Sequence, residues 1–208
     1  PPLLIVAVFA VLTWFLQKNW KIVVFVVLGF LFIMNQGYWE ETTESLTLVL
    51  SACVVCMGVG VPIGIFAAHN PGLYRFMRPV LDLMQTLPTF VYLIPVVMLF
   101  RVGDFAAMIA VVAYSLVPAI RYTDHGIRQV PASIIEAATA AGCTRWQTLR
   151  KVKLRLALPE IMLGVNQTVM MGLSMLVITA LVGTRDLGQE TLIALSKVDP
   201  GRGVTAGI

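Results

Sequence analysis

The charged residues of this chain are gathered into short stretches, and long apolar runs separate them. A helix needs about 20 predominantly apolar residues to cross a bilayer, and the longest runs reach that length. Hydrophobic residues make up 58% of the 208 residues and charged residues 12%, and the mean hydropathy is +0.86. A soluble domain averages about 45–50% apolar and about 25% charged residues. The composition therefore excludes a soluble enzyme, a disordered chain and a disulfide scaffold, and it predicts an all-α polytopic membrane protein.

Six apolar segments are predicted to be spans, and a seventh begins near the C-terminus. None shows the alternation of polar and apolar residues that is typical of membrane strands. The first, second and fifth segments are short for a span. The chain starts abruptly at Pro1 and stops at Ile208 inside an apolar run, so we expect both ends to be trimmed. The six segments are residues 3–16, 22–35, 46–68, 80–100, 105–120 and 161–182.

The longest polar stretch, residues 121–159, is strongly basic. Cytoplasmic loops of membrane proteins carry an excess of Lys and Arg, so this stretch is predicted to be cytoplasmic, together with residues 17–21 and 69–79. The sequence pI of about 9.2 then reflects membrane orientation, and no nucleic-acid partner is expected. The basic residues of the long stretch are Arg121, Arg128, Arg145, Arg150, Lys151, Lys153 and Arg155.

Small residues and prolines mark two of the predicted spans. Gly60 and Gly64 are four residues apart, a spacing that lets membrane helices pack closely. Pro62, Pro88 and Pro95 are expected to kink or loosen their helices.

The motifs of soluble catalytic and cofactor sites are absent from the sequence. It has no Gly-x-x-x-x-Gly-Lys-Ser/Thr loop for ATP phosphates, no His-Glu-x-x-His and no Gly-x-Ser-x-Gly. Cys53 and Cys56 lie in an apolar run, where they are predicted to be packing residues. His69 and His125 are predicted to be solvated loop residues. We therefore expect no catalysis by this chain, no cofactor and no metal.

The basic stretch contains helix signals of its own. Pro131 and Gly142 are typical of the start and the end of a short helix. Thr144 and Gln147 have the spacing of a capping box that opens a second helix. Pro159 is predicted to start the last span at its first helical position. The first of these helices has a nearly bare face, formed by Ala137, Ala138, Ala141 and Gly142.

These residues resemble the EAA loop of the permease subunits of bacterial ABC importers. In that family, Glu-Ala-Ala is followed by three residues, Gly, nine residues and Ile-x-Leu-Pro. This chain has Glu136-Ala137-Ala138, then Gly142, then Val152 and Leu154 at the matching places. It departs from the pattern at Arg155, where the family has Pro, and Pro159 is expected to take over the helix break.

The resemblance implies that the loop forms a coupling helix seated in a groove of an ATPase subunit. It assigns that contact to Glu136, Ala137, Ala138, Ala141 and Gly142. It also implies a substrate-binding protein, periplasmic or lipid-anchored, a second copy of the chain, and a multi-pass position in the bacterial inner (plasma) membrane. Residues 183–203, predicted to face outward, are either the docking surface of the binding protein or a simple connector.

Further segments resemble one branch of the family, the permeases for glycine betaine and related quaternary amines such as choline, with proline and trimethylamine oxide as close alternatives. This similarity runs from about residue 46 to the C-terminus, so we divide the chain into residues 1–45 and a permease core of residues 46–208, with the coupling loop at 121–159. The segments are residues 84–95 (MQTLPTFVYLIP), 130–131 (VP), 164–168 (GVNQT) and 186–189 (DLGQ).

Polar and aromatic residues within the spans are candidates for the solute path. Polar side chains at membrane depth usually face the bundle interior, where they can also simply hydrogen-bond helices together. A trimethylammonium group is attracted to aromatic faces, although such rings more often pack against lipid or core. The candidates are Asn166, Met170 and Ser174 on one face of the last span, Gln85, Thr89 and Tyr92 on one face of the fourth, and Phe90, Tyr92 and Tyr114 as aromatic residues.

Two alternatives remain open at this point. An ion-coupled secondary transporter would need acidic residues within its spans, and the spans are nearly free of them. An ABC permease for another small solute, such as an amino acid, would share the same fold. Asp82, four residues after Arg78, is expected to form an ion pair at the inner membrane edge.

Overall fold

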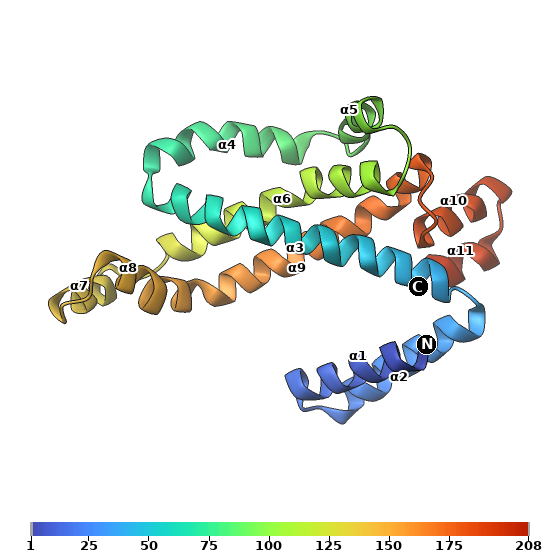
Figure 1. Ribbon diagram of the computed structural model, residues 1–208, viewed down its shortest axis with the longest axis horizontal. Helices are drawn as coiled ribbons and strands as arrows, with labels where there is room; N and C mark the ends of the chain where they lie inside the picture. Colours follow the sequence, from blue (N-terminus) through green and yellow to red (C-terminus); the bar gives the residue numbers. More distant parts are fainter. Residues whose placement is uncertain (1, 208) are drawn as a thin grey trace. The chain divides into compact units, whose positions relative to one another are not determined.

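The computed structural model describes residues 2–207, and these residues form helices and short connections with no strand among them (Figure 1). They divide into two compact units. One unit contains the chain up to Leu46 and again from Arg185 onward, and the other is Thr47–Thr184. The prediction of an all-α architecture is confirmed.

The first unit contains an N-terminal helical hairpin. Helix α1 (Pro2–Gln17) and helix α2 (Trp20–Gln36) pack through Phe9 and Phe30, whose ring centroids lie 5.2 Å apart. At 1.5 Å per residue, these helices are about 24–26 Å long, slightly less than the bilayer core of about 30 Å. The predicted apolar runs 3–16 and 22–35 are thus helical over nearly the predicted ranges.

Two short helices complete the first unit. Asp186 caps helix α10 (Leu187–Lys197), because its carboxylate accepts a hydrogen bond of 3.1 Å from the Gln189 N–H. Helix α11 (Pro200–Gly207) is joined to α10 by an Arg202–Glu190 ion pair with an Nε–Oε2 distance of 2.7 Å. This stretch was predicted only as an outer loop, and the structure gives it helical order.

Three long helices dominate the second unit, and each is long and apolar enough to cross a membrane. They are α3 (Trp39–His69), α6 (Asp104–Arg128) and a continuous helical rod over Arg145–Val182. The rod consists of α8 (Arg145–Gln147), the π-helical η1 (Thr148–Lys153), α9 (Leu154–Thr179) and the 3₁₀ turn η2 (Ala180–Val182). Each helix extends beyond the apolar run that predicted it, because polar residues at the ends of the runs remain helical.

Small residues let these helices approach closely. A Cβ atom placed on Gly60 would lie 2.6 Å from Ala119 Cβ, and one on Gly64 would lie 2.6 Å from Thr123 Cβ. A Cβ on Gly126 would lie 2.7 Å from Glu160 Cβ, so α9 approaches α6 in the same way. The prediction of close packing at Gly60 and Gly64 is confirmed, with α6 as the partner of α3.

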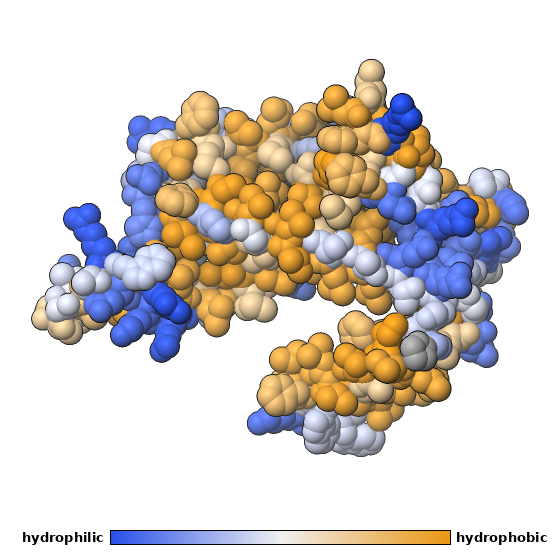
Figure 2. All heavy atoms as spheres, viewed as in Figure 1, coloured by the Kyte–Doolittle hydropathy of each residue, from blue (hydrophilic) through white to orange (hydrophobic). Residues whose placement is uncertain are grey.

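The outer surface of the second unit is apolar along its long helices (Figure 2). Large hydrophobic side chains are exposed on several helices, as expected for surfaces that contact lipid. Examples on α3, α5 and α9 are Val54, Phe66, Ile94, Met98, Leu99, Met162 and Leu173.

The predicted fourth span is not a single helix. Helix α4 (Pro71–Thr86) and helix α5 (Phe90–Phe100) meet at a bend of 96°. Leu87 adopts an extended conformation with ψ of 135°, which is the region favoured by a residue that precedes proline, here Pro88. The kink expected at Pro88 is therefore present, the span over residues 80–100 stays a prediction, and residues 71–79, predicted as a loop, belong to α4.

The predicted start of the last span is wrong. Pro159 lies inside α9, and the helix continues through it. A π-helical segment, η1, lies between the capping box and α9 instead. Such segments arise where extra residues are accommodated within a helix without ending it.

The Gly64 contact gives a test of this packing. We expect Gly64→Ala to lower the free energy of unfolding by about 1–3 kcal/mol, because the added methyl group would press on Thr123 and the Ile120 carbonyl. Gly58→Ala is the matched control on the same helix, since a Cβ there meets nothing within 4 Å. Thermal denaturation of both variants in nanodiscs measures the difference, and equal midpoints would contradict the packing.

Candidate functional site

The helix predicted from Pro131 and Gly142 is present as α7 (Ala132–Ala140). Gly142 has a φ of +78°, and its N–H donates to the Thr139 carbonyl at 2.9 Å. The Cys143 N–H donates to the Ala138 carbonyl at 3.1 Å. This pair of bonds is a Schellman motif, whose left-handed residue is usually glycine because a Cβ atom is disfavoured there. The prediction of this short helix is confirmed.

The predicted capping box opens the next helix. The Gln147 N–H donates to Thr144 Oγ1 at 3.3 Å, and the Thr144 N–H donates to Gln147 Oε1 at 2.9 Å. These bonds fix the start of α8 directly after the end of α7. Residues 131–153 therefore have a defined local structure, and they are named the coupling segment after the role that is proposed for them under Proposed function.

The coupling segment presents a bare and accessible surface. Glu136, Ala137, Ala141 and Gly142 are exposed, and Ala138 is half-buried. A Cβ atom on Gly142 would meet nothing within 4 Å, so no part of the described chain fills the space beside it. The segment follows α6 and precedes α9 at one end of the second unit (Figure 1). Trp146, 67% exposed, adds a large apolar side chain to the same segment.

Arg128, the last residue of α6, binds three helices at the base of the coupling segment. Its Nε lies 2.8 Å from Asp124 Oδ1, and its Nη2 donates to the Ala67 carbonyl of α3 at 2.8 Å. Its guanidinium also lies 4.9 Å from the ring centroid of Tyr74 on α4. Sequence analysis missed this cluster because residues 121–128 were assigned to a loop. The i, i+4 spacing of Asp124 and Arg128 was the available signal.

Asp82 forms the predicted ion pair and a second one. Its distance to Arg78 on the same helix is 3.9 Å, which confirms the prediction. Its closer partner is Arg121 of α6, which was not predicted. Asp82 thus joins α4 to α6 by a contact that sequence spacing could not reveal.

The candidates on the last span do share one face. Asn166, Met170 and Ser174 lie on α9 and are all exposed in the single chain. Ser174 Oγ donates to the Met170 carbonyl at 2.9 Å. The opposite face of α9 packs on α6 at Gly164 and on α3 and α6 at Gly172, where a Cβ would lie 3.3 Å from Val49 and 3.6 Å from Val111. The polar face is therefore free of contacts within this chain's own helix core.

The candidates on the fourth span do not share a face. Gln85 lies on α4, Thr89 lies at the bend and Tyr92 lies on α5, so the prediction of a common face is wrong. Tyr92 and Tyr114 come together, with ring centroids 5.8 Å apart, whereas Phe90 is 51% exposed.

The Tyr92 hydroxyl has a structural role at the bend. It donates a hydrogen bond to the Met84 carbonyl. In an unbroken helix that carbonyl would accept from the N–H of residue 88, but residue 88 is proline and has none. Tyr92 therefore satisfies a backbone group that Pro88 leaves without its helical partner, which matters in a lipid environment.

The cysteine and histidine predictions can be compared with the structure. Cys53 and Cys56 are buried and free, and Cys56 Sγ donates to the Val112 carbonyl at 3.5 Å, so they serve as packing residues as predicted. His69 and His125 are exposed, as predicted, but both lie on helices and not in loops. No group of metal-ligating side chains lies together among residues 2–207.

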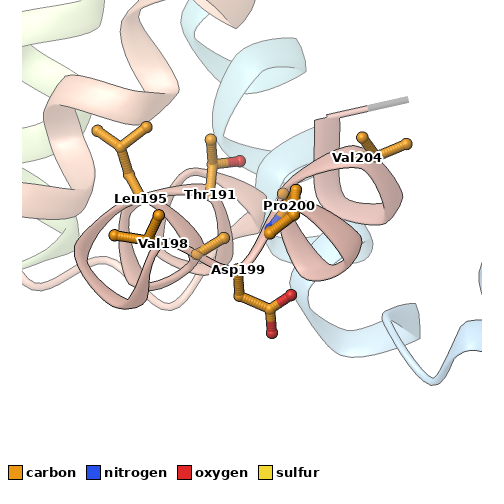
Figure 3. A pocket seen from close by; sticks show the side chains of 8 residues that line it. Thr191, Leu195, Val198, Asp199, Pro200 and Val204 are labelled. Atoms are coloured by element: carbon orange, nitrogen blue, oxygen red, sulfur yellow. The ribbon is translucent and has the colours of Figure 1, made fainter.

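Within the first unit, α10 and α11 border a shallow hollow of about 570 Å³. Its lining is mostly apolar, and Figure 3 shows Leu195, Val198 and Val204 around it. Leu195 is 76% exposed and Val198 85% exposed. The side-chain hydrogen bond with Glu190 raises the pKa of Arg202, which precedes Gly203 in the lining of this hollow.

The fold and the coupling segment can now be compared with known proteins. The family described as binding-protein-dependent transport system inner membrane component matches residues 60–204. The chain belongs to this family. It is therefore a multi-pass inner membrane permease of an ABC transport system and not an enzyme, and ATP hydrolysis belongs to a separate subunit. The family favours the predicted importer over an ion-coupled secondary transporter.

Similar proteins in this family are permeases with stated solutes. The chain is 44% identical to the glycine betaine transport system permease protein OpuAB of Bacillus subtilis over 208 residues, all of this chain and 73% of that protein. It is 42% identical to the glycine betaine/carnitine transport permease protein GbuB of Listeria monocytogenes over 92% of this chain and 68% of that protein. It is 44% identical to the glycine betaine/proline betaine permease ProW of Escherichia coli over 83% of this chain and 49% of that protein.

The permease fold is also found in a solved structure. An inward-facing conformation of the MetNI methionine ABC transporter contains a chain that matches 80% of this one with a TM-score of 0.71 and 21% sequence identity. The match covers 84% of that chain. At this identity the likeness concerns the fold, and it confirms the predicted ABC permease fold.

The Tyr92 hydrogen bond gives a test of the bend in this permease. We expect Tyr92→Phe to lower the free energy of unfolding by about 1–2 kcal/mol, because the Met84 carbonyl loses its side-chain donor. Tyr114→Phe is the matched control, since it removes a hydroxyl from the other ring of the same aromatic pair. Denaturation in nanodiscs measures both, and a Tyr114 effect as large as that of Tyr92 would contradict this role.

Proposed function

We propose that the chain is the transmembrane subunit of an ATP-driven importer for glycine betaine or a related quaternary amine. The observation that carries the proposal is the 44% identity to OpuAB along the entire chain. The names of GbuB and ProW, the other two relatives described above, also state betaine compounds as their solutes. The quaternary ammonium group is the chemistry that these named solutes share, and it is the group we assign to the solute.

The coupling segment is proposed to contact the ATPase subunit. Supporting this, Glu136, Ala137, Ala141 and Gly142 are exposed on a helix whose end is fixed by hydrogen bonds. With side chains no larger than a methyl group, Ala137, Ala141 and Gly142 let another protein surface approach the backbone of α7 closely. Ala138, half-buried, completes the proposed contact. Movement of the ATPase subunits would then displace the coupling segment and switch the spans between inward and outward access.

The importer is proposed to work as a pair of permease chains with a substrate-binding protein on the outer side. We assign residues 46–208 to the permease core, in line with the family match over residues 60–204, and the first 45 residues to two additional spans. Residues 183–203 are proposed to be the docking surface for the binding protein. The exposed Leu195 and Val198 of α10 and its connection support this assignment.

The solute path is proposed to follow the free polar face of α9. Asn166, Met170 and Ser174 support this because they are exposed on α9, and polar side chains such as those of Asn166 and Ser174 usually face the bundle interior at membrane depth. Tyr92 and Tyr114 offer aromatic faces for a quaternary ammonium group. Gln85, Thr89 and Phe90 remain candidates at and beside the bend.

Solute uptake tests the proposed function directly. We expect proteoliposomes that contain this chain, its ATPase subunit and its binding protein to accumulate labelled glycine betaine when ATP is supplied. Unlabelled carnitine, choline and proline would rank the related solutes by competition, and methionine would test an amino-acid importer. Accumulation driven by an ion gradient without the ATPase subunit would contradict the proposal.

The coupling contact can be tested by co-purification. We expect Gly142→Asp to abolish recovery of the ATPase subunit with the chain, because a charged side chain would occupy the bare surface of the coupling segment. Asn and Asp are similar in size and tolerate a positive φ about equally well. Comparison of Gly142→Asn with Gly142→Asp therefore separates the effect of side-chain size from the effect of the added charge. Gly72→Asp, at another site where a Cβ would meet nothing within 4 Å, is the control. Full recovery with Gly142→Asp would refute the contact.

A further inference from the structure

Arg128 occupies the junction between the membrane helices and the coupling segment. It ends α6, and α7 begins at Ala132, four residues later. This is one of the two places where α7 connects to the membrane helices, and the other is the helical rod that begins at α8. The contacts of Arg128 therefore join α7, through the end of α6, to further helices close to the coupling segment.

The first contact fixes Arg128 to its own helix. Asp124 is buried, with only 3% of its surface exposed, and the Arg128 Nε–Asp124 Oδ1 distance is 2.8 Å. A buried carboxylate is strongly destabilised without a partner charge, so the guanidinium is held close to Asp124. The Arg128 side chain itself is only 35% exposed, which further limits its freedom.

The second contact reaches the end of α3. Arg128 Nη2 donates to the Ala67 carbonyl at 2.8 Å. Residue 71, which would supply the helical N–H for this carbonyl, is proline, and the Asn70 N–H lies at a longer 3.2 Å. Cations also interact favourably with the carbonyls at a helix C-terminus. Arg128 therefore serves as a cap for α3 provided by α6.

The third contact reaches α4. The guanidinium carbon of Arg128 lies 4.9 Å from the ring centroid of Tyr74, within the range of a cation–π interaction. Tyr74 is half-buried one turn after the start of α4 at Pro71. One side chain thus contacts α3, α4 and α6 on both sides of the α3–α4 connection.

We propose that Arg128 is a positioning residue for energy coupling: it fastens the α3–α4 connection to the end of α6, so that movement of the coupling segment is passed to all three helices. This inference rests on the proposed importer function. Lysine cannot replace the planar guanidinium, because a single ammonium group cannot bond Asp124 and the Ala67 carbonyl and also stack on Tyr74 in the same geometry.

The test compares ATP hydrolysis and solute uptake in the reconstituted complex of chain, ATPase subunit and binding protein. We expect Arg128→Lys to hydrolyse ATP near the wild-type rate, while the glycine betaine imported per ATP falls at least about fivefold, the lower end of typical coupling between sites. The double variant Asp124→Asn/Arg128→Gln should show the same fall in glycine betaine imported per ATP. It removes both charges together, so it leaves no buried charge unpaired. Arg75→Gln on α4 is the control for loss of an exposed cation and should keep the wild-type ratio.

A purely structural role predicts a different pattern. If hydrolysis and uptake fell in equal proportion in both variants, or if both variants kept the wild-type ratio, the inference would be overturned. Hydrogen exchange provides a second measurement: the amides of the last turn of α3 should exchange faster in Arg128→Lys, and unchanged exchange would also count against the cap. If the wild-type complex itself did not import betaine with ATP, the proposed function would fail, independently of Arg128.

Discussion

Backbone carbonyls that lose their helical partner are a strong constraint on this permease, because lipid offers no replacement donor. Two prolines create such carbonyls where helices end. Pro88 leaves the Met84 carbonyl to the Tyr92 hydroxyl, and Pro71 leaves the Ala67 carbonyl to the guanidinium of Arg128, beside the longer Asn70 N–H contact. In both cases a side chain replaces a backbone donor. These two points where the chain turns are therefore defined by specific contacts, and each has a single side chain on which its geometry depends.

Helix α6 is the element on which the second unit is assembled. Lipid tails are as apolar as the helices, so burial of apolar surface adds little to helix association, and close contact of small residues is required instead. Gly60 and Gly64 bring α3 against one side of α6, while Gly126 and Gly164 bring α6 and α9 together. Because α6 leads into the coupling segment, the movement proposed for that segment would reach the helix on which α3 and α9 are packed.

The sequence predicted those features whose signals lie within a few residues. Gly142 and the Thr144–Gln147 pair each specify a helix end through local hydrogen bonds, and the structure has both. Pro62, Pro88 and Pro95 were all expected to kink or loosen their helices, but Pro62 and Pro95 lie within continuous helices, and of the three only Pro88 lies at the 96° bend. What differs at Pro88 is the Tyr92 hydroxyl, whose position depends on how the chain folds back. The contacts of Arg128 with α3 and α4 could not be predicted either, because they join residues that are distant in sequence: Ala67 is 61 residues from Arg128.

The coupling segment is connected to the membrane helices by two routes of different character. On its C-terminal side, a continuous helical rod runs from Arg145 to Val182, so α8 and α9 are joined through the backbone hydrogen bonds of a helix. On its N-terminal side, α7 follows α6 through the short connection after Arg128, and side-chain contacts carry the link to α3 and α4. Under the proposed coupling, movement would reach α3 and α4 through side-chain contacts: those of Arg128, and the Lys153–His69 contact of 3.3 Å between η1 and the end of α3.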